Sequence, residues 1–220
     1  KKSLHKDAAG NLFLVGVIRD ITKSKRTEQE LRKAAAELSR SNVELKLSED
    51  RLRYLAYHDP LTGLGNRKRF YECLSQTLDW ARCNNQLVAL MFLDLDGFKQ
   101  VNDTLGHDTG DQLLKVVAQR LSGSLRSSDV VSRLGGDEFT VIVPGIPQAE
   151  YAATVAEKIL ESLSQVFVLE GHNVFVTVSI GISIFPQDGQ GEELLIKNAD
   201  MAMYRAKQLG RNQHQFSNSL

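Results

Sequence analysis

Residues 86–96 read QLVALMFLDLD, an almost wholly apolar run that ends in two acids. A short apolar run of this kind is typical of a strand that is covered on both faces. Helices packed on either side of a sheet provide such cover. The run therefore predicts a buried strand inside a layered α/β domain.

Helix and strand patterns alternate over residues 58–220. The further segments expected are a helix over 108–125 behind the N-cap Asp108, a strand, turn and strand over 130–143, a helix over 149–163, and a helix over 192–210 that stops at Gly210. Residues 173–185, NVFVTVSIGISIF, alternate strictly and predict one long central strand. This order predicts an α/β (α+β) fold with a central, mainly antiparallel five-stranded sheet flanked by helices.

The N-terminal residues have a different pattern. In residues 1–22 a Gly-Asn pair precedes the apolar stretch Leu12–Ile18, which predicts one strand of a hairpin. Residues 23–57 contain no Gly or Pro and predict a single helix. Its leucines recur every seven residues and form an imperfect coiled-coil seam at Leu31, Leu38, Leu45 and Leu52. Either this seam pairs two chains, or the helix lies on its own domain.

Composition excludes several classes of protein. Lys and Arg together number 27, as do Asp and Glu, so the formal net charge is zero. That balance argues against a dedicated nucleic-acid or membrane-surface binder, while a small anionic ligand remains compatible. Cys73 and Cys83 lack metal-ligand neighbours and are expected to be small buried residues in a reducing cytoplasm. Because the chain starts with Lys1 and has no apolar run of about 20 residues, we expect a cytoplasmic fragment that an anchor or sensor could precede.

Acidic residues gather where two strands are expected to end. Asp94 and Asp96 follow the apolar run, where carboxylates can reach solvent or a hard divalent cation such as Mg²⁺. The alternative is that they only cap the helix beginning near Gly97. Pairing this strand with the hairpin around Gly135 would bring Asp94 beside two more acids, at positions 137 and 138. Three carboxylates at two strand ends suit two-metal nucleotidyl transfer.

The residues of that hairpin turn spell Gly-Gly-Asp-Glu-Phe, residues 135–139, and resemble the signature of the GGDEF family. These diguanylate cyclases join two GTP molecules into cyclic di-GMP with release of pyrophosphate. DPLTGLGNR at 59–67, FLDLDGFKQVNDTLGHDTGD at 92–111 and NADMAMYRAKQLGRN at 198–212 resemble its other motifs in order. The resemblance covers residues 58–220 and implies a fold similar to the palm of polymerases and nucleotide cyclases.

The resemblance implies a role for each matching position. The catalytic positions are Asp137, which matches a general base for the 3′-hydroxyl, Glu138 and Lys99. The ligands of Mg²⁺ or Mn²⁺ are Asp94, the Leu95 carbonyl, Asp137 and Glu138. The substrate-binding positions are Phe98, Asn102, His107, Asp111, Gly135, Gly136, Lys207 and Arg211. Among these, Asn102 and Asp111 match readers of guanine, and Lys207 and Arg211 match phosphate contacts.

Several of these positions also have simpler explanations. Asp111 falls near the third residue of its predicted helix, where an acid is favoured without any ligand, and Lys207 and Arg211 lie near a helix C-terminus, where cations are favoured. His107 can simply satisfy a turn. Arg126 and Asp129 match the family's R-x-x-D inhibitory site for product, although such a pair is commonly a surface ion pair.

Residues 1–22 resemble the end of a PAS sensory domain, whose closing D-I-T matches Asp20, Ile21 and Thr22. Residues 23–57 would then be a signalling linker between that domain and the cyclase. The predicted function is Mg²⁺-dependent synthesis of cyclic di-GMP between two facing domains of a homodimer, with product inhibition. A catalytically silent GTP-binding module, a cyclic di-GMP receptor and a different nucleotide cyclase are the alternatives.

Overall fold

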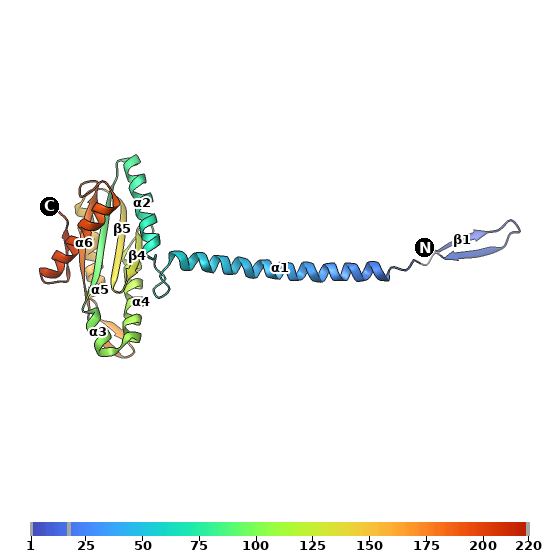
Figure 1. Cartoon of the computed structure of the whole chain (residues 1–220), viewed down its shortest axis with the longest axis horizontal. Coiled ribbons are helices and arrows are strands. Elements are labelled where there is room, and N and C mark those ends of the chain that lie inside the picture. The colour runs from blue at the N-terminus through green and yellow to red at the C-terminus, as the bar shows by residue number, and fades with distance from the viewer. Residues whose placement is uncertain (1, 17–18, 219–220) are drawn as a thin grey trace. The chain divides into compact units, whose positions relative to one another are not determined.

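The computed structural model describes residues 2–16 and 19–218, which form two units, Lys1–Leu52 and Arg53–Leu220 (Figure 1). Within the described ranges, every helix is too short or too polar to cross a membrane.

The first unit contains a hairpin and most of a long helix. Strands β1 (Lys2–Lys6) and β2 (Leu12–Gly16) pair antiparallel, and the Asp7 carboxylate accepts hydrogen bonds from the backbone N–H groups of Ala9 and Asn11 in the turn. The predicted hairpin is confirmed, while the last residues of its apolar stretch, 17 and 18, lie outside the described residues. Resemblance to a PAS domain stays a prediction.

Helix α1 (Thr22–Tyr57) is the predicted single helix, and it continues into the second unit. The leucines of the predicted seam are between 59% and 65% exposed, but Leu47, which is outside the seam, is 64% exposed. Exposure alone therefore does not single out the seam. Pairing of two chains through it stays a prediction.

The second unit is built on a sheet with the strand order β4-β5-β3-β8-β9. Its strands are β3 (Leu87–Asp96), β4 (Val130–Gly135), β5 (Glu138–Ile146), β8 (Thr177–Phe185) and β9 (Gln213–Phe216). Every neighbouring pair is antiparallel except β8 and β9, which are parallel. The predicted five-stranded, mainly antiparallel sheet is confirmed.

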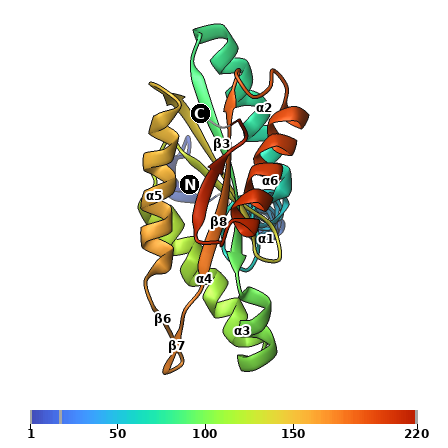
Figure 2. The same ribbon diagram turned by 90° about the vertical axis from the view of Figure 1, so that its left-hand side faces the viewer.

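Helices cover both faces of this sheet, as Figure 2 shows with α5 on one side and α2 and α6 on the other. The helices of this unit are α2 (Arg67–Asn84), α3 (Phe98–Leu105), α4 (His107–Ser124), α5 (Glu150–Ser164) and α6 (Glu192–Gln208). Strand β3 sends alternate side chains to the two layers: Leu93 packs with α4 and α5, whereas Leu90 packs with α2 and α6. The period of two in a strand explains why the whole run is apolar.

The predicted long strand over 173–185 is wrong in one respect. The segment is divided into β7 (His172–Val174) and β8, and β7 turns back to pair with β6 (Phe167–Leu169). Phe175, at the break, is 75% exposed. The apolar alternation did predict the buried face correctly, because Val178, Ile180, Ile182 and Ile184 all lie in one core cluster.

Two smaller predictions are also wrong. Helix α4 begins at His107 with Gly106 as its N-cap, so Asp108 is not the cap and Asp111 lies beyond the first turn. Cys83 is exposed, and Cys73 is only half-buried, packed at the border of the core cluster that contains Phe70 and Leu74. Helix α2 itself was not among the predicted elements, although Phe70, Leu74, Leu78 and Ala81 follow helical spacing and are buried.

Candidate functional site

Two strands bring the predicted carboxylates to one place. In the antiparallel pairing of β3 and β5, Asp94 is the register partner of Glu138. The next residue along β3, Leu95, donates its backbone N–H to the Asp137 carbonyl at 3.3 Å. The expected convergence of Asp94 with Asp137 and Glu138 is confirmed. These residues form what we call the acidic edge: Asp94, Leu95, Asp137 and Glu138.

The turn that carries the acidic edge depends on its two glycines. Gly135 has φ +145° and Gly136 has φ +55°, values that residues with a side chain rarely adopt. The pairing of β4 with β5 shifts its register between Arg133 and Gly135, so the turn leaves the regular ladder there. The glycines thus shape the bend, as predicted, and leave Asp137 and Glu138 half-buried rather than sealed in the core.

Helix α6 supplies the cation of this edge. Lys207 Nζ lies 2.7 Å from Asp94 Oδ2, with side chains 30% and 13% exposed respectively. The close approach of α6 to β8 makes this possible, because a Cβ on Gly181 would stand 2.0 Å from the Ala199 carbonyl oxygen. A residue larger than glycine at position 181 would push α6, and Lys207 with it, away from the sheet.

The charge of Asp94 is incompletely compensated. Burial raises the pKa of this carboxyl, and the nearby Asp137 carboxylate raises it further, while the hydrogen bond from Lys207 lowers it. The net result is a pKa above the ordinary value of an aspartate. A buried acid with a perturbed pKa beside another acid is typical of functional sites.

Asp96, the second acid of the D-x-D pair, has a different environment. It is buried, and it accepts hydrogen bonds from the hydroxyl groups of Thr177 and Ser179, each at 2.8 Å. Arg211 Nε lies 3.8 Å from its carboxylate. The expectation that both acids reach solvent or a cation is therefore wrong as to solvent for Asp96, which is buried with its oxygens bonded by β8 and lies beside the Arg211 cation. The capping alternative is wrong too, since Gly97 caps α3 with no side-chain bond.

The predicted nucleotide-binding residues lie on α3 and α4, which follow β3 directly. Phe98, the first residue of α3, is half-buried against the core, and Lys99 is exposed beside it. Asn102 packs its side chain against Gly110 of α4. His107 and Asp111 are exposed on the first two turns of α4. The structure places these residues on two adjoining helices, but no hydrogen bond among the described residues links their side chains to the acidic edge.

The acidic edge has the chemistry of a metal site without its full geometry. Among residues 2–16 and 19–218, no group of three or more His, Cys, Asp or Glu side chains is arranged to hold a metal ion. Carboxylate and carbonyl oxygens are nonetheless the ligands that Mg²⁺ and Mn²⁺ prefer. The Lys207 ammonium neutralises only one of the acids and binds an oxygen that a metal ion would need. The residues fit a divalent cation by charge and by ligand type.

The predicted inhibitory residues lie apart from the acidic edge. Arg126 and Asp129 face a cavity of about 350 Å³, together with His58 and Arg69, which the sequence did not single out. The Asp129 carboxylate accepts the backbone N–H of Arg126 at 2.9 Å, and the Arg126 guanidinium lies over the Tyr151 ring. The two side chains therefore do not form the simple surface ion pair that was the alternative.

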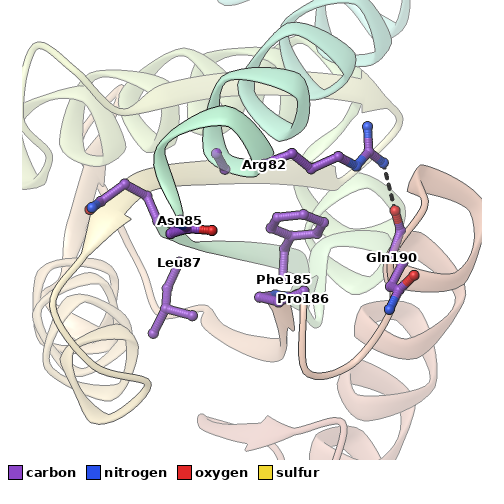
Figure 3. Close-up of a pocket in the computed structure, with 8 residues that line it drawn as sticks. Arg82, Asn85, Leu87, Phe185, Pro186 and Gln190 are labelled. Carbon is purple, nitrogen blue, oxygen red and sulfur yellow. Dashed lines mark hydrogen bonds between the residues drawn. The ribbon is translucent and has the colours of Figure 1, made fainter.

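A second cavity, of about 400 Å³, lies at the opposite end of the sheet, where β3 begins and β8 ends (Figure 3). Arg82 donates a hydrogen bond to the Gln190 carbonyl across it and stacks on Phe185. The described residues that line this cavity include no acid.

Comparison with known proteins gives the family. A family profile described as "Diguanylate cyclase, GGDEF domain" matches residues 56–213. Two proteins of Pseudomonas aeruginosa are similar to the chain: the cyclic di-GMP phosphodiesterase NbdA, 41% identical over 86% of this chain and 24% of that protein, and the bifunctional diguanylate cyclase and phosphodiesterase MucR, 43% identical over 84% and 26%. The chain thus spans about a quarter of the length of these relatives.

A solved structure is also similar, that of the coiled coil and GGDEF domain of DgcB from Caulobacter crescentus in complex with c-di-GMP. The two share 32% sequence identity and a TM-score of 0.73, over 86% of this chain and 98% of that one. The chain belongs to the GGDEF domain family.

Proposed function

We propose that the second unit is a diguanylate cyclase, which joins two GTP molecules into cyclic di-GMP and releases two pyrophosphates. The observation that carries the proposal is the acidic edge. Asp94 and Glu138 are register partners, the Asp137 carbonyl is hydrogen-bonded to β3, and the pKa of Asp94 is raised. A structural ion pair has no need of this excess of negative charge.

In this reaction each 3′-oxygen forms a bond to the α-phosphorus of the other GTP, and the bond from that phosphorus to pyrophosphate breaks. Asp137 takes the proton of the attacking hydroxyl group. Asp94, the Leu95 carbonyl, Asp137 and Glu138 would hold Mg²⁺ or Mn²⁺, which when bound supplies positive charge against the triphosphate. Lys99 stabilises the charge that develops on the phosphates.

The other predicted residues bind the nucleotide. Asn102 and Asp111 recognise guanine, with Phe98 and His107 beside them, and the exposed Gly135 and Gly136 let the phosphates approach the backbone. Lys207 and Arg211 contact phosphate oxygens. Because Lys207 is paired with Asp94 in the structure, binding of a metal nucleotide would exchange that partner for a phosphate.

Catalysis between two GTP molecules requires two facing domains, so we propose that the chain acts as a homodimer joined through α1. Cyclic di-GMP would inhibit the enzyme at Arg126 and Asp129, and the similarity to a c-di-GMP complex of DgcB supports a product-binding site. A PAS-like sensory domain preceding the chain, in a cytoplasmic or membrane-anchored protein, would set the activity.

Incubation of the chain with GTP and Mg²⁺, followed by mass spectrometry and a pyrophosphate assay, tests the proposal. We expect cyclic di-GMP and two pyrophosphates per product, with neither formed by Asp137→Asn. Offering ATP together with GTP identifies a cyclase of another specificity by its product.

A catalytically silent GTP-binding module is the second candidate, because a relative that aligns over 86% of the chain is named a phosphodiesterase. In that case the chain would bind GTP with Mg²⁺ but release no pyrophosphate. A pure receptor would bind cyclic di-GMP equally well after Asp137→Ala.

A further inference from the structure

Arg133 lies on β4, two residues before the first glycine of the turn, and its guanidinium joins two groups, the Gly136 carbonyl and the Asp59 carboxylate. Its Nε donates to the Gly136 carbonyl at 2.9 Å. One terminal nitrogen lies 3.0 and 3.1 Å from the two carboxylate oxygens of Asp59. The side chains of Arg133 and Asp59 are only 11% and 16% exposed, so the pair is well shielded from water.

Asp59 is itself held in place by its own loop. Its carboxylate accepts the Thr62 backbone N–H at 2.9 Å and the Thr62 hydroxyl at 2.6 Å. Its backbone N–H donates to the Leu64 carbonyl at 2.8 Å. The orientation of the Arg133 guanidinium is therefore fixed by an acid that has little freedom to move.

The Gly136 carbonyl belongs to the peptide plane that precedes Asp137. The plane that follows Asp137 is held from the other side, because the Asp137 carbonyl accepts the Leu95 N–H at 3.3 Å. Two planes held on either side of one residue fix its backbone dihedral angles. Those angles set the direction in which the Asp137 carboxylate leaves the turn.

The same loop is bonded to the end of helix α1. Asn66 donates its backbone N–H to the Tyr57 carbonyl at 2.9 Å and its side-chain amide to the Ala56 carbonyl at 3.0 Å. Arg133 donates its own backbone N–H to the Gly65 carbonyl at 2.8 Å. Residues 58–66 thus connect the last turn of α1 to β4 through hydrogen bonds at several points.

We propose that Arg133 is a positioning residue for catalysis, held by Asp59, which fixes the turn so that Asp137 faces its substrate and cation. The proposal rests on the proposed cyclase function and assigns a role to two residues outside the acidic edge. It also gives the end of the linker helix a direct mechanical connection to the catalytic turn.

Arginine is required by this geometry. Its planar fork binds a carboxylate with one nitrogen and a carbonyl with another, whereas the single ammonium of lysine cannot hold both at this separation. Arg133→Lys keeps the charge opposite Asp59 and loses the bond to Gly136. Arg82→Lys is a matched control, because Arg82 also bridges a carboxylate, that of Asp79, and a carbonyl, at the far end of the sheet (Figure 3).

The test compares both variants with the unaltered chain in kcat, in KM for GTP and in thermal midpoint. We expect Arg133→Lys to lose kcat by about tenfold to a hundredfold, as a displaced catalytic group does, with KM and thermal midpoint close to those of Arg82→Lys. An unchanged kcat would overturn the proposal, and so would a loss that Arg82→Lys reproduces.

Binding of Mn²⁺ together with the slowly reacting analogue GTPαS provides a readout that does not depend on turnover. If the unaltered chain makes no cyclic di-GMP, the proposed function fails, and the Arg133 proposal is decided by this binding alone. Weaker Mn²⁺ binding by Arg133→Lys supports it, and equal binding overturns it. If Arg133→Lys does not fold, Asp59→Asn replaces it: we expect the same loss in kcat and in Mn²⁺ binding, here with a lower thermal midpoint, and an unchanged kcat or equal Mn²⁺ binding overturns the proposal.

Discussion

Asp59 and Asp94 are both partly buried, and both face a basic side chain, but their environments have opposite effects. Burial raises the pKa of Asp59, yet hydrogen bonds from Thr62 and Arg133 outweigh it and bring the pKa below the usual value. For Asp94, burial and the neighbouring Asp137 outweigh the single bond from Lys207, and the pKa is raised. An acid that the protein satisfies fully holds structure together, whereas one left short of positive charge can serve a cation and substrate.

Replacement of Asp94 should break this contrast most strongly. We expect Asp94→Asn to reduce pyrophosphate release by at least about a hundredfold, because the acidic edge loses a ligand. Its thermal midpoint at pH 7 should stay equal or rise, since a carboxylate that is costly to ionise is removed. Steady-state kinetics and calorimetry check both. A large fall in midpoint would contradict the account of Asp94.

Replacement of Asp59 should lower stability, which replacement of Asp94 should not. Asp59→Asn leaves the shielded Arg133 guanidinium without its counter-ion, and we expect a loss of about 2–4 kcal/mol in the free energy of unfolding. Asp79→Asn, in an exposed ion pair with Arg82, is the control and should lose less than about 1 kcal/mol. Urea denaturation measures both. Equal losses would show that the Asp59 pair is an ordinary surface ion pair.

The pH dependence of stability follows from the lowered pKa of Asp59 and the raised pKa of Asp94. A depressed pKa means that the stability from Asp59 is present above its unfolded pKa and is lost as pH falls through the folded value. A raised pKa means that protonated Asp94 favours folding at low pH, and this contribution is lost as pH rises through its folded pKa. Activity needs ionised Asp94, so it should fail on the acid side at a higher pH than an ordinary aspartate would give.

Lys207→Gln should move the acid limb of kcat/KM to a still higher pH, because it removes the group that lowers the pKa of Asp94. Lys197→Gln, on the same helix, is the control and should leave the limb in place. If the acid limb of the kcat/KM profile does not move in Lys207→Gln, the ionisation of Asp94 does not determine that limb.

Changes in the linker helix should have the smallest effect on activity when the protein concentration is high. Leu38→Lys together with Leu45→Lys would place charges in the predicted seam, and we expect this double variant to lose specific activity on dilution. Leu47→Lys, outside the seam, should match the unaltered chain. Specific activity measured over a dilution series tests this, and identical curves for both variants would argue against pairing through the seam.

The local sequence pattern predicted the elements whose structure depends mainly on neighbouring residues. The apolar run of β3, the glycine turn and the meeting of Asp94 with Glu138 follow from strand periodicity and one assumed pairing. The break at Phe175 could not be predicted from strand periodicity, because it depends on the pairing of β7 with β6. Nor could spacing separate Asp94 from Asp96, since the groups that satisfy Asp96 are distant in the sequence, among them the hydroxyl groups of Thr177 and Ser179, 81 and 83 residues away.

Asp59 lies within the motif at 59–67 and Arg133 within the predicted strand, turn and strand over 130–143, yet the sequence pattern assigns a role to neither. They are 74 residues apart, and nothing in either motif indicates that the two side chains meet. Strand β9 is similar: its residues QHQF carry no strand pattern and pair only because α6 returns the chain beside β8.

A titration of the aspartate carboxyl groups by ¹³C NMR tests the contrast between Asp59 and Asp94 most directly, with the two residues assigned in the same sample. We predict that Asp94 titrates above the usual range and Asp59 below it, and that Mg²⁺ with GTPαS lowers the pKa of Asp94 while leaving Asp59 unchanged. Ordinary values for both, or an Asp94 that does not respond to the metal nucleotide, would contradict the account.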